Sequence, residues 1–172
     1  MLRLTALTAA IWGGIFCSSG EDSVFFKSGM NEIGRLSCEK GEYVINKWFS
    51  CGGTIGNISL SCNGEYIFVV PYLLSNKDDY PVYTVSVNDS KIAQMHIIRG
   101  ITDVTSVRQV SESVLLVFGK SITDSFSSSS DPRLFVYDMA SDRIMRSIEA
   151  RKYFFLSCSA VAYQGRSELA AG

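Results

Sequence analysis

Two stretches of this 172-residue chain repeat one pattern about 50 residues apart. Residues 64–70 (Gly-Glu-Tyr-Ile-Phe-Val-Val) align with residues 112–118 (Glu-Ser-Val-Leu-Leu-Val-Phe). Residues 82–92 align with residues 134–144 in the same order: an apolar run, a polar turn, then a basic residue and Ile. The second copy is longer within residues 119–133, a polar segment where an insertion costs little. The chain is therefore built from repeated units, and such units bury their faces against their neighbours.

The repeated segments have the composition of β-strands. Four runs are rich in β-branched and aromatic residues and are bounded by Gly, Pro, Asn, Asp or Ser: residues 66–70, 82–87, 114–118 and 134–137. No window shows the apolar spacing of an amphipathic helix, and residues 143–148 fit a fourth strand better than a short helix. Units of roughly 50 residues with about four strands are typical of propeller blades. The sequence predicts an all-β fold, a partial β-propeller of about three four-stranded antiparallel blades.

The repeat also predicts approximate blade boundaries. Because residues 167–172 align with residues 114–119, the chain enters a further unit near its end. The predicted incomplete propeller spans residues 21–172, with blades at 21–53, 54–103 and 104–153 and the start of another at 154–172. Closed propellers need at least about four blades. We therefore expect a fragment or truncated form of a larger protein, whose open blade edge self-associates or needs the missing blades.

Two segments resemble a known repeat family. Residues 134–144 (Leu-Phe-Val-Tyr-Asp-Met-Ala-Ser-Asp-Arg-Ile) resemble the third strand and turn of a WD repeat, with Tyr137 and Asp138 at the Trp-Asp positions. Residues 61–70 (Ser-Cys-Asn-Gly-Glu-Tyr-Ile-Phe-Val-Val) resemble the strand–turn–strand that this family writes as Ser-Pro-Asp-Gly-x-x-Leu. Gly-His and Trp-Asp dipeptides are absent, so the resemblance is to a divergent form. It implies a β-propeller that acts as a non-enzymatic scaffold for protein–protein interaction.

The charge balance argues against nucleic acid as a partner. Lys and Arg number 16 and Asp and Glu number 17, for a formal net charge of −1. Phosphate binding requires a clustered basic surface, and the sequence has no basic run longer than a pair. We expect other proteins as partners and no nucleic acid.

Few residues have metal-binding chemistry. The five cysteines form no C-x-x-C pair, and His96 is the single histidine. A structural zinc site needs about four Cys or His ligands, usually in close-spaced pairs. We therefore expect no metal and no cofactor. The disulfide state of Cys38, Cys51, Cys62 and Cys158 stays open.

The sequence offers no clear catalytic constellation. His96 could act as a general base, but its place in an apolar run favours a partly buried strand residue. Asp138 and Asp142 flank a turn, where short carboxylates accept hydrogen bonds from backbone N–H groups. We therefore expect that the protein is not an enzyme.

Exposed loop residues are the candidates for partner binding and modification. Aromatic and acidic side chains at strand ends suit such contacts, since Tyr is enriched in binding hot spots. The candidates are Tyr72, Asp78, Asp79, Tyr80 and Tyr153. The Ser-rich segment suggests phosphorylation at Ser127, Ser128, Ser129 and Ser130.

Residues 1–20 have two interpretations. Arg3 precedes an apolar run to Cys17 and then small residues, as in a signal peptide, but the same residues also fit first propeller strands. Asn57 and Asn88 begin N-glycosylation patterns. We expect a cytoplasmic protein; the alternative is a secreted propeller with ligand-binding or hydrolase activity. No segment has the ~20 apolar residues needed to cross a bilayer, so we expect no membrane span.

Overall fold

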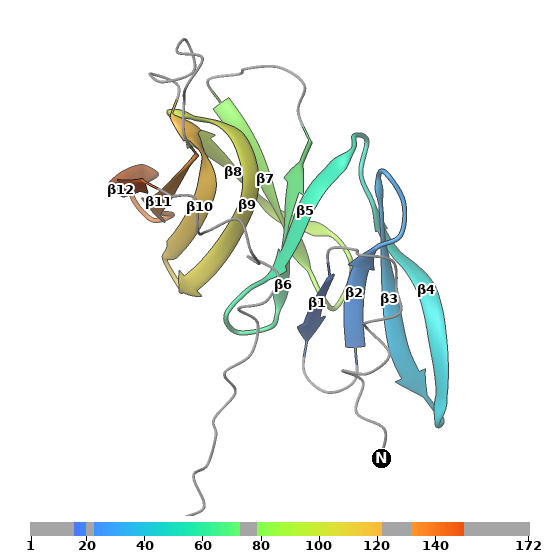
Figure 1. The fold of residues 1–172 in the computed structure, drawn as a ribbon. Helices are drawn as coiled ribbons and strands as arrows, with labels where there is room; N and C mark the ends of the chain where they lie inside the picture. The colour runs from blue at the N-terminus through green and yellow to red at the C-terminus, as the bar shows by residue number, and fades with distance from the viewer. Residues whose placement is uncertain (1–15, 20–22, 73–78, 122–131, 150–172) are drawn as a thin grey trace, which may run out of the picture.

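The computed structural model describes residues 16–19, 23–72, 79–121 and 132–149, and for 16–19 the backbone alone. All regular secondary structure in these residues is β-strand, arranged in three antiparallel sheets of four strands (Figure 1). Within each sheet the strands lie in chain order. The predicted all-β fold is thus confirmed.

The twelve strands divide evenly along the described residues. The first sheet contains β1 (Phe16–Ser19), β2 (Ser23–Lys27), β3 (Glu32–Glu39) and β4 (Glu42–Ser50). The second contains β5 (Ile55–Leu60), β6 (Tyr66–Pro71), β7 (Asp79–Ser86) and β8 (Ile92–Arg99). The third contains β9 (Ile101–Ser111), β10 (Val114–Ser121), β11 (Arg133–Asp138) and β12 (Arg143–Glu149).

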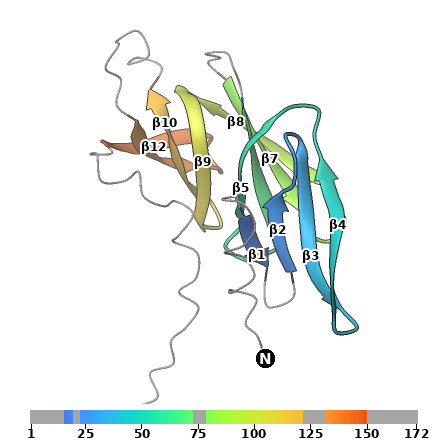
Figure 2. The ribbon, with the colours of Figure 1, turned by 45° about the vertical axis from the view of Figure 1, so that its right-hand side comes forward.

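The sheets pack as blades of a propeller do. The first strand of each sheet is innermost: β5 lies against β1 on one side and β9 on the other. The fourth strands β4, β8 and β12 lie outermost, and most of their side chains are exposed. Figures 1 and 2 show the second sheet between the other two. This radial order of consecutive four-stranded sheets defines a partial β-propeller.

The second sheet is buried on both faces, which explains its continuous apolar runs. Along β6, Phe68 and Val70 pack toward the third sheet, whereas Ile67 and Val69 pack toward the first. Successive side chains of a strand point to opposite faces, so one uninterrupted run supplies two cores. Between the first and second sheets, the Trp48 indole N–H also donates to the carbonyl of Val87 at 3.3 Å.

The second and third sheets share an irregularity in the pairing of their third and fourth strands. The β7–β8 register shifts between Thr84 and Val85, and the β11–β12 register shifts between Val136 and Tyr137. The sequence alignment places these two positions over each other. In each case β8 or β12 has one extra residue, a β-bulge. The same local geometry is therefore repeated in two sheets.

The strand assignments agree with the sequence patterns where the structure describes them. Residues 143–148 form most of β12, as the fourth-strand interpretation predicted. The first sheet begins at Phe16, ahead of the predicted blade boundary at residue 21, because β1 pairs with β2 from Phe16↔Phe26 to Ser19↔Ser23. Part of the segment 1–20 is thus strand.

Within the described residues, no helix has the length and apolar character needed to cross a lipid bilayer.

Candidate groove between the second and third sheets

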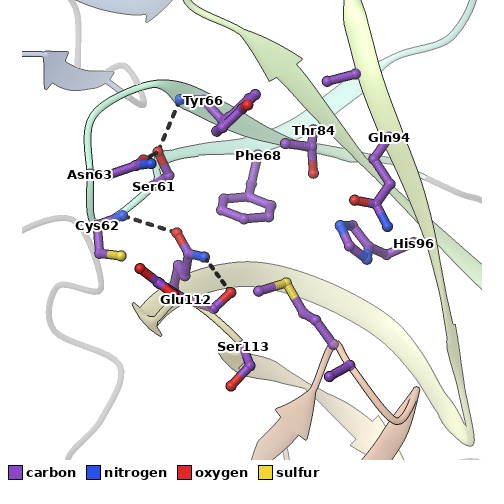
Figure 3. A pocket seen from close by; sticks show the side chains of 14 residues that line it. Ser61, Cys62, Asn63, Tyr66, Phe68, Thr84, Gln94, His96, Glu112 and Ser113 are labelled. Carbon is purple, nitrogen blue, oxygen red and sulfur yellow. Dashed lines mark hydrogen bonds between the residues drawn. The ribbon is translucent and has the colours of Figure 1, made fainter.

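An open groove lies between the second and third sheets (Figure 3). Its volume is about 540 Å³. The second sheet contributes the β5–β6 turn and side chains of β6, β7 and β8. The third sheet contributes Gln109 of β9 and the β9–β10 and β11–β12 turns. Residues from both repeats therefore meet at one site.

One wall of the groove is the tight turn between β5 and β6. The Ser61 hydroxyl donates to Asn63 Oδ1 at 2.7 Å and accepts the N–H of Tyr66 at 2.9 Å. The Gly64 N–H donates to the Ser61 carbonyl at 3.1 Å, with Gly64 at φ 76°. Glycine adopts this left-handed conformation without a Cβ clash. The Ser-x-Asn-Gly sequence thus encodes a rigid wall.

Gln109 holds this wall to the third sheet. Its Oε1 accepts the N–H of Cys62 at 3.0 Å, and its Nε2 donates to the carbonyl of Glu112 at 3.2 Å. The two bonds connect the β5–β6 turn with the β9–β10 turn, as Figure 3 shows. One hydrogen bond between the sheets, from Cys62 to Gln109, thus holds the groove at this end, and the bond from Gln109 to Glu112 fixes the Gln109 side chain.

The floor combines an aromatic ring with a buried hydroxyl. Phe68 and Thr84 are cross-strand partners on β6 and β7, and they are 2% and 7% exposed. Thr84 Oγ1 is buried and has no hydrogen-bond partner. Such groups are rare and call for an explanation. Thr84 in turn pairs with Gln94 of β8.

The bulge in β8 widens the polar side of the groove. Ala93 is the extra residue between Ile92, which pairs with Val85, and Gln94, which pairs with Thr84. In a regular strand adjacent side chains point to opposite faces, yet Ala93 and Gln94 both line the groove. The bulge therefore turns a second side chain toward this face.

His96 stands on the β8 side of the floor and is partly buried, as its apolar neighbours predicted. Its ring centroid lies 6.4 Å from that of Phe68. Burial lowers the pKa of His96 below its ordinary 6.5, and the Asp142 carboxylate offsets part of this effect. The imidazole is consequently neutral at pH 7 and offers one donor and one acceptor.

The β11–β12 turn forms the opposite rim. Asp138 Oδ1 accepts the Ala140 N–H at 3.1 Å and Oδ2 accepts the Ser141 hydroxyl at 2.6 Å. Both bonds lower the pKa of the Asp138 carboxyl, and the bond from Ser141 has the larger effect. The Tyr137 hydroxyl donates to Asp142 Oδ1. Asp138 thus has the turn-stabilising role that the sequence predicted, and the rim holds its shape without a ligand.

Catalytic pairing is not evident in this site. Cys62 and His96 lie on opposite sides of the groove with Phe68 between them (Figure 3). Among the described residues, no hydrogen bond joins His96 to a hydroxyl or a thiol. Cys38, Cys51 and Cys62 are free thiols, and no group of three His, Cys, Asp or Glu residues in the described ranges is placed to hold a metal.

The structure places two of the predicted partner-binding residues on the surface. Tyr72 follows β6 and is 59% exposed. Asp79 begins β7, and its carboxylate lies 3.6 Å from the Arg99 guanidinium. Both lie away from the groove, which they do not line. The other predicted sites lie outside the described residues: Asp78, Tyr153, and Ser127, Ser128, Ser129 and Ser130.

Tyr80 corrects a prediction. It was expected at a loop surface, but it belongs to β7 and is 3% exposed. Its hydroxyl donates to the carbonyl of Pro71 and, at 3.2 Å, to that of Val104. A side chain buried in the core between two sheets cannot serve as a surface anchor.

The two glycosylation patterns fall in different surroundings. Asn57 lies within β5, the innermost strand of the second sheet, and is partly buried. Asn88 is exposed in the turn between β7 and β8. Acceptor sites occur in surface loops, so Asn88 has the accessible geometry and Asn57 does not.

Sequence reasoning did not assign a role to four of the residues that line the groove. Phe68, Thr84, Gln94 and Gln109 belong to strands whose patterns indicate structure alone. Thr84 alone has a sequence signal, because it is a polar residue on the core-facing side of an apolar strand, in the alternation that begins at Tyr80. The meeting of these four residues depends on how two repeats pack.

The topology places this chain in the class of all-β proteins with propeller-type sheets. No protein-family model and no curated protein matches its sequence. Solved structures similar to it include the β-propeller domain of the Trilobed protease from Pyrococcus furiosus, at TM-score 0.45 and 11% identity over 81% of this chain and 44% of that chain. The WD40 β-propeller domain of Doa1 has TM-score 0.44 and 9% identity over 80% of this chain and 68% of that chain.

The dihydro-heme d1 dehydrogenase NirN in complex with DHE has TM-score 0.44 and 14% identity over 81% of this chain and 36% of that chain. This chain thus spans less than half of the protease propeller that it resembles. The three proteins have different functions by their names.

Proposed function

We propose that this protein is a WD-repeat-like, non-enzymatic interaction scaffold that binds a segment of a partner protein in the groove between its second and third sheets. The observation that carries the proposal is the make-up of the groove floor, where the buried Phe68 ring lies beside a buried hydroxyl of Thr84 that has no partner. Binding sites combine an apolar lining with a few well-placed polar groups in this way.

The size and rigidity of the groove support a short ligand. Its volume of about 540 Å³ lies within the range of ligand pockets and suits one or two side chains of a bound segment. The walls are held by the Gln109 and Asp138 hydrogen bonds before any ligand arrives. Preformed walls lower the entropy cost of association.

The charges around the groove indicate what it rejects. Of the described residues that line it, Glu112 is acidic and none is Lys or Arg. Asp142 lies close enough to His96 to affect its pKa. An anionic ligand would meet like charge without a compensating cation. The proposal therefore favours neutral or cationic peptide segments.

Selection from a random peptide library tests the proposal. The full chain is immobilised, and enriched peptides are then measured against Ala140→Trp, which places a large ring at the groove rim from an exposed turn position. Met30→Trp is the matched control, since Met30 is 71% exposed and lies outside the groove. We expect peptides whose affinity falls at least tenfold, about 1.4 kcal/mol, in the groove variant and stays unchanged in the control.

Two outcomes would count against the proposal. In the first, the library yields no peptide that binds above background. In the second, its peptides bind Ala140→Trp as tightly as the unaltered chain. In the second case the interaction surface lies elsewhere on the molecule.

A further inference from the structure

We infer that the groove accepts an uncharged carboxamide side chain, Gln or Asn, of the bound segment between the Thr84 hydroxyl and the His96 imidazole. This inference rests on the proposed function, because it names the side chain that the bound segment supplies. It adds a chemical specificity that the general shape of the groove does not provide.

The Thr84 hydroxyl is the first reason. Thr84 is 7% exposed, lines the groove, and its Oγ1 makes no hydrogen bond. Figure 3 shows this oxygen directed toward the centre of the groove. A buried hydroxyl normally has at least one partner, and here the open side of the groove is where a partner can enter. A ligand atom that bonds to Thr84 Oγ1 supplies the hydrogen-bond partner that this oxygen lacks in the free protein.

The position of His96 is the second reason. Thr84 pairs with Gln94, and His96 lies two residues further along β8 on the same face. Diagonal neighbours of this kind in an antiparallel sheet lie about 7–8 Å apart. A carboxamide has an acceptor oxygen and a donor nitrogen, each able to form a bond of about 2.9 Å. One such group can bridge the two side chains.

The burial of the floor is the third reason. The same desolvation that lowers the pKa of His96 penalises a charged ligand group at this depth. A carboxylate would also share the groove with the acidic Glu112. An ammonium group could donate to both side chains, but it would pay the desolvation cost of a full charge at this depth. A methyl-terminated chain would leave Thr84 Oγ1 without a partner.

Three small probes test this specificity on the unaltered full chain: the N-acetyl methylamides of glutamine, glutamate and norleucine, which have similar lengths. The readout is the imidazole carbon-bound proton signal of His96, which is unique because the chain has one histidine. We expect saturable shifts with the glutamine probe and affinities at least about fivefold weaker for the other two, the effect of one hydrogen bond.

A pair of hydroxyl deletions tests the role of Thr84. Thr84→Val keeps the shape of the side chain and removes the hydroxyl, and we expect it to weaken binding of the glutamine probe about fivefold. Ser59→Ala is the matched control, since Ser59 Oγ is also buried without a partner but does not line the groove. We expect this control to bind as the unaltered chain does.

Equal affinities for the three probes, shifts that stay linear and never saturate, or undiminished binding by Thr84→Val would each overturn the inference. The probe comparison decides even where the variant fails to fold. If library peptides bind the groove but tolerate Leu in place of their Gln or Asn, the inference fails and the proposed function stands. If the glutamine probe binds while no peptide does, the proposed function fails and the carboxamide site stands.

Discussion

Replacing Tyr80 by Phe removes one oxygen from the junction of the second and third sheets. The ring is buried in the core that these sheets share, at 3% exposure. The hydroxyl donates to the carbonyl of Pro71 at the end of β6 and to that of Val104 in β9. Because the ring remains in Tyr80→Phe, no large cavity forms, and the change isolates the hydrogen bonds.

The magnitude follows from the partners that are lost. A typical neutral hydrogen bond contributes about 0.5–1.5 kcal/mol net, and a buried acceptor left without a donor costs somewhat more. We therefore expect the free energy of unfolding to fall by about 1–2 kcal/mol. A domain of ordinary stability, about 5–15 kcal/mol, would tolerate this loss and remain folded.

Urea unfolding followed by tryptophan fluorescence measures the change, with an unaltered dependence on urea concentration as evidence of an unaltered native state. Tyr72→Phe is the control, because Tyr72 is 59% exposed and its change should stay within about 0.5 kcal/mol. If both variants have the same stability as the unaltered chain, Tyr80 does not form the interior bonds described above. The surface role predicted from sequence would then return.

Two further predictions concern pH and packing. His96 has a folded-state pKa below 6.5, so the unfolded chain gains a proton first as pH falls; stability should decrease from pH 7 toward pH 5, and His96→Gln should flatten that decrease in urea titrations. An unchanged slope in the variant would contradict this. In Gly119→Ala the new Cβ would lie 2.8 Å from Ile101 Cγ2 and 3.0 Å from the Thr102 carbonyl oxygen, and we expect a loss of about 1–3 kcal/mol. Gly52→Ala, with nothing within 4 Å, should stay within about 0.5 kcal/mol, and equal thermal unfolding of the two variants would refute the packing argument.

The error at Tyr80 shows how local composition can mislead. The residue follows Asp79 and precedes Pro81, and such surroundings are typical of loops. Yet Tyr80, Val82 and Thr84 alternate on the buried face of β7. The period of two was present in the sequence, and it outweighs the polar neighbours because strand pairing places every second side chain in the core.

The repeat was the strongest guide to the fold. Each repeat has too few apolar side chains on one face to form a core alone, so recurrence of the pattern requires side-by-side packing. The β-bulges follow the same repeat, since register shifts occur at equivalent positions beside Thr84 and Val136. The turns at Ser61 and Asp138 could likewise be predicted from the sequence, because these side chains form hydrogen bonds with residues close in sequence.

The linear order of residues thus determined the strands, the turns and the modular character of this protein, all of which depend on short-range contacts and side-chain alternation. The groove was decided by tertiary packing. Gln109 bonds to Cys62, and Thr84 lines the same groove as Met139 and Ala140, because two sheets that are separate in the sequence pack against each other. No local pattern records the angle between neighbouring sheets, since that angle results from the fit of whole buried faces.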